Sequence, residues 1–339
     1  MTSLIGNAPV DGVDVAALLG IPISAEQERA VQAPLKPCAV IAGAGTGKTT
    51  VMAARVVWLV ASRLVSPEEI LGLTFTNKAT AELSERIESN LTRVGLLTSE
   101  QPRPTVATYD SFAGTLVNDY GAWDGISTGA HLITGARAYQ LAAEVVMGLD
   151  KAPLAATHMG PTFIAQAVVK LAGAMASHDA SPGKVRRADA RWRQMLLAAP
   201  TKRGGDRYAD IDKWLSRVDE REELLDLVAA YQNLKKERGL VEFGDRMVQA
   251  LHLVTHHPRV GEELRARYRV VLLDEYQDTS SAQADVLAAL FSGPDSAHGM
   301  GHPVMAVGDP LQAIYEWRGA AASNILEFHR RFPNKEGTP

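Results

Sequence analysis

The chain has 339 residues, of which 46% are hydrophobic and 22% are charged, as is typical of a folded globular protein and unlike collagen-like or disordered chains. Its 35 Lys and Arg residues are outnumbered by 39 Asp and Glu, so the formal net charge is −4. That balance excludes a uniformly basic surface for nucleic acid, and any site for a polyanion must be local.

The sequence contains a single cysteine, Cys38, which excludes an internal disulfide, and no Cys/His spacing of a zinc site occurs. No basic residue precedes an apolar run near the start, and no apolar stretch approaches the roughly 18 residues that a membrane span needs. We therefore expect a cytoplasmic protein with no membrane partner.

Short apolar runs bounded by Gly or Pro predict five buried strands. They are Cys38–Ala42, Ile70–Phe75, Thr105–Tyr109, Val270–Asp274 and Val304–Val307. Longer segments with helical spacing separate them, as at Thr50–Leu64 and Lys78–Val94. Strands that alternate with helices form parallel β-α-β units, so the sequence predicts an α/β fold with a doubly wound parallel sheet.

The strand signals stop between Thr105–Tyr109 and Val270–Asp274, and residues from Gly114 to Gly239 have the pattern of helices and loops. This stretch is too long for one crossover connection and indicates a helical domain inserted into the α/β domain. We expect residues 1–115 and 241–339 to form one discontinuous domain and residues 116–240 to form the insertion.

A glycine-rich loop follows the first predicted strand and runs into a helix, the order that a phosphate-binding loop requires. Glycine allows backbone N–H groups to turn towards phosphate oxygens, and the helix N-terminus adds its dipole. Lys48 would reach the β- and γ-phosphates of ATP, and the Thr49 hydroxyl would bind Mg²⁺. The alternative is a glycine-rich turn with a chance Lys-Thr pair. The predicted nucleotide-binding residues are Gly43, Ala44, Gly45, Thr46, Gly47, Lys48, Thr49 and Thr50.

Two adjacent carboxylates, Asp274 and Glu275, end the fourth predicted strand. Acidic residues at the carboxyl end of a strand face the crevice where ligands bind to such sheets. Asp274 is a candidate Mg²⁺ ligand together with Glu275, and Glu275 could also polarise a water molecule for attack on the γ-phosphate. This pair favours ATP hydrolysis over small-molecule phosphorylation or a simple nucleotide switch.

The fifth predicted strand leads to Gln312, which could reach the γ-phosphate, and then to three residues suited to stacking on bases. These are Tyr315, Trp317 and Arg318. Aromatic residues two positions apart are also common in hydrophobic cores, and this second interpretation stays open.

Together these segments resemble the motifs of superfamily 1A DNA helicases of the UvrD/PcrA/Rep/RecB type over most of the α/β part of the chain. The similar segments are Ile23–Gln27, Ala42–Thr49, Thr74–Ala79 with Glu82 and Arg86, Thr108–Phe112, Glu242–Asp245, Asp274–Asp278 and Gly308–Gly319. The resemblance implies a RecA-like P-loop NTPase domain, 1A, with an inserted helical domain, 1B. The sequence departs from the family pattern at three positions. Ser24 replaces the usual Asn, Thr50 stands where the family often has Arg, and Asp110 stands where it commonly has His.

The resemblance also implies roles for individual residues. Gln27 would read the adenine edge, and Lys48, Glu275 and Gln312 would act in catalysis. Contacts to single-stranded DNA are implied for Phe75, Asn77, Thr108, Tyr315, Trp317 and Arg318.

The function implied is the ATP-binding half of a helicase or translocase that couples Mg-ATP hydrolysis to movement on single-stranded DNA. The resemblance also implies that it meets junctions between single-stranded and duplex DNA, in DNA repair or recombination. Motifs IV, V and VI are not found, so we expect an amino-terminal 1A/1B part that is poorly active alone. A nucleotide-gated DNA-binding switch, or a scaffold with a vestigial phosphate loop, is the alternative.

Two segments, Ala53–Val60 and Phe112–Leu116, are more similar to AdnB, a subunit of actinobacterial heterodimeric helicase–nucleases, than to UvrD. This finer resemblance implies a second helicase–nuclease subunit as a partner.

One segment, 184–207, is locally basic, with eight Lys and Arg against two Asp, a difference of 8 − 2 = +6. Trp192 lies within it and Tyr208 beside it. It could grip a DNA backbone, or it could be a solvated helix face whose charge is offset by acidic residues elsewhere.

Overall fold

A computed structural model of the chain describes residues 12–127, 129–149, 160–202, 205–314 and 323–336. The predicted residues Tyr315, Trp317 and Arg318 lie outside this part. The chain divides into two compact units, Met1–Asp124 with Gln249–Pro339 as unit 1 and Gly125–Val248 as unit 2.

The unit boundaries fall later in the chain than the predicted ones at 115/116 and 240/241. Helix α5 (Tyr109–Tyr120) is continuous and packs on the sheet of unit 1, so the chain leaves that unit only after the helix ends. The second boundary lies inside one continuous helix, α10 (Phe243–His256). A pattern of helices and loops carries no signal for such a division.

Unit 1 is built on a five-stranded sheet with the order β1-β7-β6-β2-β3, and every neighbouring pair is parallel. Its strands are β1 (Cys38–Ile41), β2 (Ile70–Thr74), β3 (Thr105–Thr108), β6 (Val270–Leu273) and β7 (Val304–Gly308). The predicted α/β fold with a parallel sheet is therefore confirmed. Strands β2, β6 and β7 are buried along their whole length, which is why they appear in the sequence as continuous apolar runs.

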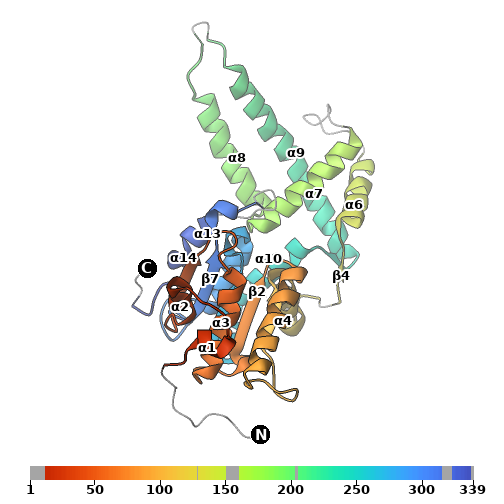
Figure 1. Cartoon of the computed structure of the whole chain (residues 1–339). Coiled ribbons are helices and arrows are strands. Elements are labelled where there is room, and N and C mark those ends of the chain that lie inside the picture. Colours follow the sequence, from red (N-terminus) through yellow and green to blue (C-terminus); the bar gives the residue numbers. More distant parts are fainter. Residues whose placement is uncertain (1–11, 128, 150–159, 203–204, 315–322, 337–339) are drawn as a thin grey trace. The chain divides into compact units, whose positions relative to one another are not determined.

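The helices of unit 1 connect these strands (Figure 1). They are α1 (Val15–Leu19), α2 (Ala25–Val31), α3 (Lys48–Ala61), α4 (Asn77–Arg93), α5, most of α10, α11 (Pro258–Arg267), α12 (Ser281–Phe291), α13 (Ser323–Leu326) and α14 (Phe328–Arg331). Four short 3₁₀ turns are η1 (Pro67–Glu69), η2 (Gly121–Asp124), η3 (Tyr276–Asp278) and η4 (Pro310–Gln312).

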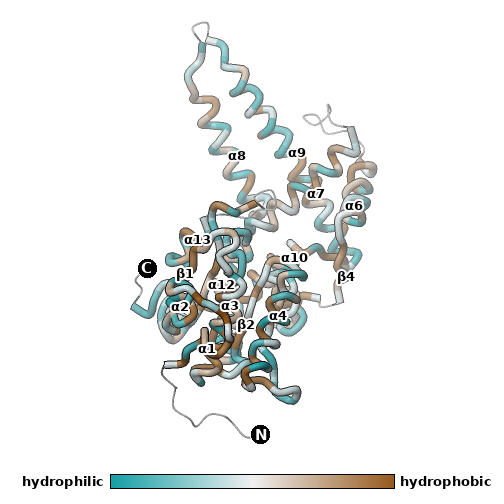
Figure 2. The backbone as a smooth tube through the Cα atoms, viewed as in Figure 1, coloured by the Kyte–Doolittle hydropathy of each residue, from teal (hydrophilic) through white to brown (hydrophobic). Residues whose placement is uncertain are grey.

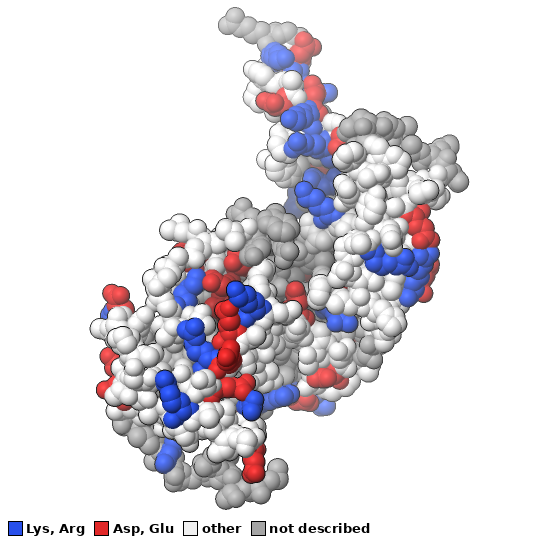
Figure 3. Space-filling model, turned by 45° about the vertical axis from the view of Figure 1, so that its right-hand side comes forward, with Lys and Arg blue, Asp and Glu red and all other residues white. Residues whose placement is uncertain are grey.

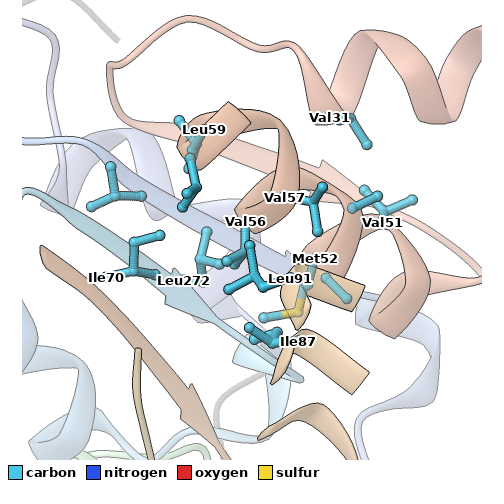
Figure 4. Packing of buried hydrophobic residues seen from close by; sticks show 14 of the residues in the cluster. Val31, Val51, Met52, Val56, Val57, Leu59, Ile70, Ile87, Leu91 and Leu272 are labelled. Carbon is cyan, nitrogen blue, oxygen red and sulfur yellow. The ribbon is translucent and has the colours of Figure 1, made fainter. Parts of the chain in front are cut away.

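Helix α3 contributes many buried residues to the unit 1 core, and Figure 2 shows hydrophobic colours along it. Met52, Val56 and Val57 are fully buried and pack with Ile87 of α4 and Leu272 of β6 (Figure 4). Full burial of such a side chain contributes about 1.5–3 kcal/mol. This packing fixes the helix whose first residue is Lys48.

A buried arginine on α3 holds the preceding helix. Arg55 is only 1% exposed, and its Nη1 donates to the carbonyl oxygens of Ala30 (3.3 Å), Val31 (3.0 Å) and Ala33 (2.8 Å). These oxygens lie at and just beyond the end of α2, where carbonyls lack helical partners. Burial lowers the pKa of Arg55. The guanidinium therefore joins α2 to α3.

Unit 2 is mainly helical, with α6 (Gly135–Met147), α7 (Pro161–Ser177), α8 (Pro182–Leu197) and α9 (Ala209–Glu237). Its core is formed by α6, α7 and α9, with Leu141, Val168 and Val228 fully buried. Its short parallel strand pair, β4 (His131–Leu132) with β5 (Leu240–Val241), was not predicted. Strands of two residues are too short for a period-2 pattern.

No helix in the described part of the chain combines the length and the apolar character needed to cross a bilayer.

Acid pH is expected to destabilise unit 1 through His302, which precedes β7. Its Nε2 donates to the carbonyl of Tyr268 (2.9 Å), its ring stacks on Phe291, and burial lowers its pKa from 6.5 to about 4. The unfolded chain therefore takes up a proton at a higher pH than the folded protein does. The free energy of unfolding should be unaffected by this group above pH 6.5 and should fall between pH 6.5 and about 4.

Urea unfolding at pH 7 and pH 4.5 checks this expectation in the wild type and in His302→Gln, with exposed His329→Gln as the matched control. The wild type and the control should lose more stability at the lower pH than His302→Gln does. An equal loss in all three proteins would show that His302 is not responsible.

Candidate nucleotide-binding site

The glycine-rich loop connects β1 to α3 in unit 1. Gly45 and Gly47 have φ of 73° and 84°, the left-handed region that side chains with a Cβ rarely adopt. The loop is closed on itself, because Thr46 Oγ1 donates to the carbonyl of Gly43 at 2.8 Å. Helix α3 begins at Lys48 without a side-chain cap, so no side chain occupies its first N–H groups. This is the arrangement expected of a phosphate-binding loop.

Helix α2 contacts the same loop through Gln27. Its Nε2 donates to the carbonyl of Thr46 at 2.9 Å, while its Oε1 accepts from the Ser24 backbone N–H at 2.9 Å in a capping box. Both polar atoms of the side chain therefore have partners. The residue predicted to read adenine lies at the loop, and to meet a base it would have to exchange one of these contacts.

The two halves of the predicted site meet at one ion pair. Lys48 Nζ lies 2.9 Å from Glu275 Oε2, although the two residues are 227 positions apart in the sequence. Strand β7 lies between β1 and β6, so the loops that follow these three strands are neighbours at the carboxyl-end edge of the sheet. The glycine-rich loop and the Asp274–Glu275 pair therefore converge at one edge of the sheet.

Glu275 is held in an unusual conformation. Its φ of 46° is left-handed, which is uncommon for a residue other than glycine and occurs most often at functional sites. Gln277 Nε2 donates to Glu275 Oε2 at 2.8 Å, and Gln277 Oε1 accepts from the Asp309 backbone N–H at 3.1 Å. Gly308 makes room for this side chain, since a Cβ there would lie 2.1 Å from Gln277 Oε1. Gln277 therefore fixes Glu275 to the end of β7.

Asp274 is 5% exposed, and its Oδ1 is buried with no hydrogen-bond partner among the described residues. Burial, and then the charge of Glu275, raise its pKa to about 6. Its main-chain carbonyl accepts from the hydroxyl of Tyr109 at 2.8 Å. An unpartnered carboxylate oxygen at this edge is suited to a hard cation such as Mg²⁺.

The described residues contain no group of three or more His, Cys, Asp or Glu placed to hold a metal ion. A cation here would therefore take few protein ligands and would need oxygens from phosphate and water, which is how Mg²⁺ is usually bound with a nucleotide. Asp274 and the Thr49 hydroxyl at the start of α3 fit that requirement.

The end of β7 carries Asp309 and Gln312. Gln312 Nε2 donates to Asp309 Oδ2, which lowers the pKa of Asp309, and Asp309 Oδ1 accepts from the Leu311 backbone N–H. The side chain of the predicted γ-phosphate sensor is thus held against a neighbouring carboxylate.

Thr50, at the third position of α3, accepts a hydrogen bond from Arg86 of α4, with 2.8 Å between Arg86 Nη1 and Thr50 Oγ1. The helicase pattern often has an arginine where this chain has Thr50. Here a guanidinium comes from the neighbouring helix instead, a contact that sequence spacing could not indicate.

The predicted DNA-contacting residues that the structure describes lie after β2 and at the end of β3, on the same edge of the sheet. Asn77 is exposed at the first position of α4, and Phe75 is half-buried just before it. Thr108 is buried and caps α5, with its Oγ1 accepting from the Ser111 backbone N–H at 3.0 Å. Of these three residues, Asn77 presents its side chain most freely to solvent.

The basic segment 184–207 is partly neutralised by ion pairs within unit 2. Arg186 pairs with Glu222 and Asp226, Arg193 pairs with Asp219, and both contacts join α8 to α9. Figure 3 shows blue and red side chains interspersed along this hairpin. The acidic residues lie on α9 and outside the counted segment, so the interpretation as an offset helix face is favoured over a free basic patch.

Comparison with known proteins decides the family. The profile of the UvrD/REP helicase N-terminal domain matches residues 23–333. The chain belongs to the UvrD/REP helicase family. The predicted assignment to superfamily 1A is therefore confirmed.

UvrD/REP relatives match almost the whole chain. DNA helicase II of Rickettsia typhi is 28% identical over 313 residues, which cover 91% of this chain and 40% of the relative. ATP-dependent DNA helicase UvrD1 of Mycobacterium tuberculosis is 28% identical over 317 residues, 92% of this chain and 36% of the relative. DNA helicase II of Escherichia coli is 28% identical over 324 residues, which cover 96% of this chain and 38% of the relative.

The chain thus spans between 36% and 40% of the length of these UvrD/REP relatives. The finer resemblance to AdnB stays a prediction.

Proposed function

We propose that this chain is the Mg-ATP-binding part of an ATP-dependent DNA helicase or translocase. The observation that carries the proposal is the meeting of Lys48 and Glu275 at 2.9 Å beside the unpartnered Asp274 Oδ1. The similarity to DNA helicases named as ATP-dependent supports the same activity. We assign unit 1 to domain 1A and unit 2 to domain 1B of that family.

In this proposal Lys48 changes partner when nucleotide binds. Its ammonium pairs with Glu275 in the structure and would move to the β- and γ-phosphate oxygens, which are stronger anionic partners. Glu275 would then be free to accept a proton from the attacking water, while Gln277 keeps its carboxylate in place.

The remaining residues position the triphosphate. Backbone N–H groups of residues 43–49 would surround the phosphates, and Asp274 and Thr49 would hold Mg²⁺, which neutralises the charge that develops during phosphoryl transfer. Gln312 would sense the γ-phosphate once its side-chain amide breaks the hydrogen bond to Asp309. Gln27 and Thr50 would face the nucleoside side of the site.

The proposed substrate is single-stranded DNA, with junctions to duplex met by domain 1B, in DNA repair or recombination. Phe75 and Asn77 follow β2 at the edge that carries the ATP site, so a strand bound there would lie near the nucleotide. Thr108, Tyr315, Trp317 and Arg318 complete the proposed contacts, and a second helicase–nuclease subunit is a further proposed partner.

Phosphate release from ATP, with and without an oligonucleotide of single-stranded DNA, tests this function on the chain itself. Glu275→Gln should keep Mg-ATP binding and lower phosphate release by about 10²-fold or more, the usual contribution of a general base. Single-stranded DNA should change the nucleotide affinity of the wild type.

The matched control is Glu85→Gln, an exposed glutamate on α4, which should behave as the wild type does. Phosphate release that is equal in the Glu275→Gln and wild-type proteins would contradict the catalytic assignment. Nucleotide binding that no DNA affects would indicate a switch instead of a motor.

A further inference from the structure

A second concave site lies in unit 1, on the edge of the sheet opposite the ATP site. It has a volume of about 390 Å³, within the range of small-molecule sites. Its walls come from Leu35 before β1, from Arg265 and Arg269 before β6, from residues 299–303 before β7, and from Lys335. Apart from Lys335, these segments precede the strands, whereas the residues of the proposed ATP site follow them, so the two sites are separated by the length of the strands.

The charge of this cavity is one-sided. Arg265, Arg269 and Lys335 line it, and no Asp or Glu is among its lining residues in the described part of the chain. His302 also lines it but is neutral at pH 7, because burial lowers its pKa to about 4. The chain as a whole has a net charge of −4, so a cavity with only cationic charges departs from the general balance.

Arg265 is held in a fixed position. Its Nη1 donates to the carbonyl of Leu290 at 2.5 Å. Its side chain also passes close to two glycines: a Cβ added at Gly261 would lie 2.7 Å from Arg265 Nη1, and a Cβ added at Gly299 would lie 2.9 Å from Arg265 Cδ. Burial lowers its pKa, although the charge of Glu262 acts in the opposite direction. A partly buried guanidinium with no carboxylate bonded to it among the described residues gains energy when an anion binds.

The other two cations are available to a ligand. Among the described residues, the ion pair found for Arg269 is a long contact of 3.7 Å with Glu69, and its side chain is 53% exposed. Lys335 is exposed and lies against Gly301. A Cβ added at Gly301 would lie 2.3 Å from the Cγ of Lys335. The glycines at 299 and 301 therefore allow two of the three cationic side chains to approach the wall of the cavity.

We propose that this cavity binds a small phosphorylated molecule that carries at least two phosphate groups. Three cationic residues that line one hollow match the charge of such a ligand, and guanidinium groups bind phosphate oxygens with good geometry. A nucleic-acid backbone would be matched better by cations spread along a groove than by a single pocket. The proposal does not depend on the function proposed above.

Isothermal titration calorimetry with inorganic pyrophosphate tests the site. Lys48→Ala is used as the background, with EDTA in place of Mg²⁺, so that the phosphate loop contributes little. Pyrophosphate should bind, and the double replacement of Arg269→Gln and Lys335→Gln should weaken its binding by about tenfold or more. Both side chains are accessible to solvent, so the fold should survive their replacement.

Arg259→Gln is the matched control, because this exposed arginine lies on α11 like Arg265 but does not line the cavity. It should leave the affinity for pyrophosphate unchanged. Absence of pyrophosphate binding, or equal affinity in the double variant and its background, would overturn the proposal. Displacement of pyrophosphate by a short single-stranded oligonucleotide would also overturn it, in favour of a nucleic-acid contact.

Discussion

Replacing Lys48 by alanine is expected to weaken the binding of Mg-ATP to this chain by about 100-fold or more, because an ammonium bonded to phosphate oxygens contributes about 3 kcal/mol. The side chain is only 10% exposed and pairs with Glu275 at 2.9 Å. Lys48 is the single Lys or Arg of the loop Ala42–Thr49, so no other cation of the loop can replace it. Equilibrium titration with a fluorescent ATP analogue measures the change.

Lys78→Ala is a matched control for this experiment. Lys78 has a side chain that is 86% exposed and a loose contact of 3.7 Å with Glu82, so its loss should leave ATP binding within about a factor of two of the wild type. An equal affinity of Lys48→Ala and wild type would show that the glycine-rich loop is not the nucleotide site.

The largest loss of stability is expected from Arg55→Ala, about 3–5 kcal/mol in the free energy of unfolding. The substitution leaves a cavity in the core and removes the donor for the carbonyls of Ala30, Val31 and Ala33. Chemical denaturation measures it. Because α2 carries Gln27 against the phosphate loop, the folded variant should also bind ATP more weakly.

Two further variants test the cause of this loss. Arg29→Ala on α2 removes an exposed arginine and should change the stability by less than about 0.5 kcal/mol. Arg55→Lys keeps a charge and donors and should recover part of the lost stability. A loss from Arg55→Ala no larger than that from Arg29→Ala would show that the carbonyl contacts contribute little.

The parallel sheet could be predicted because its strands are short, buried runs bounded by Gly or Pro. Strand β6 is buried at all four residues and has the sequence Val-Val-Leu-Leu. The sequence pattern predicts Tyr109 as the last residue of a strand, whereas the structure has it as the first residue of α5. A residue at such a junction fits both patterns, and the Thr108 cap that starts the helix decides between them.

The meeting of Lys48 with Glu275, the proposed catalytic pair, could be predicted from the sequence because each residue follows a strand and the carboxyl ends of parallel strands meet at one edge. Gln277 and Tyr109 were not assigned roles, because their contacts join residues remote in sequence. Gln277 reaches the end of β7, and Tyr109 reaches the carbonyl of Asp274. Only the packing of neighbouring strands brings these atoms together.

The charge environment of the basic segment 184–207 could not be predicted from the sequence. Its charge was counted within 184–207, but the acids that neutralise Arg186 and Arg193 belong to α9. A count over one segment cannot include a partner helix. The short strands β4 and β5 were missed for a related reason, because their pairing joins His131 to Leu240 across the whole of unit 2.

The central claim is that the glycine-rich loop and Asp274 hold one Mg-nucleotide between them. It is tested most directly by measuring the affinity for a non-hydrolysable ATP analogue with and without Mg²⁺, in the wild type, in Asp274→Asn and in the exposed control Asp119→Asn. Mg²⁺ should tighten binding in the wild type and in Asp119→Asn, and should have little effect in Asp274→Asn. The same Mg²⁺ enhancement in all three proteins would contradict the claim.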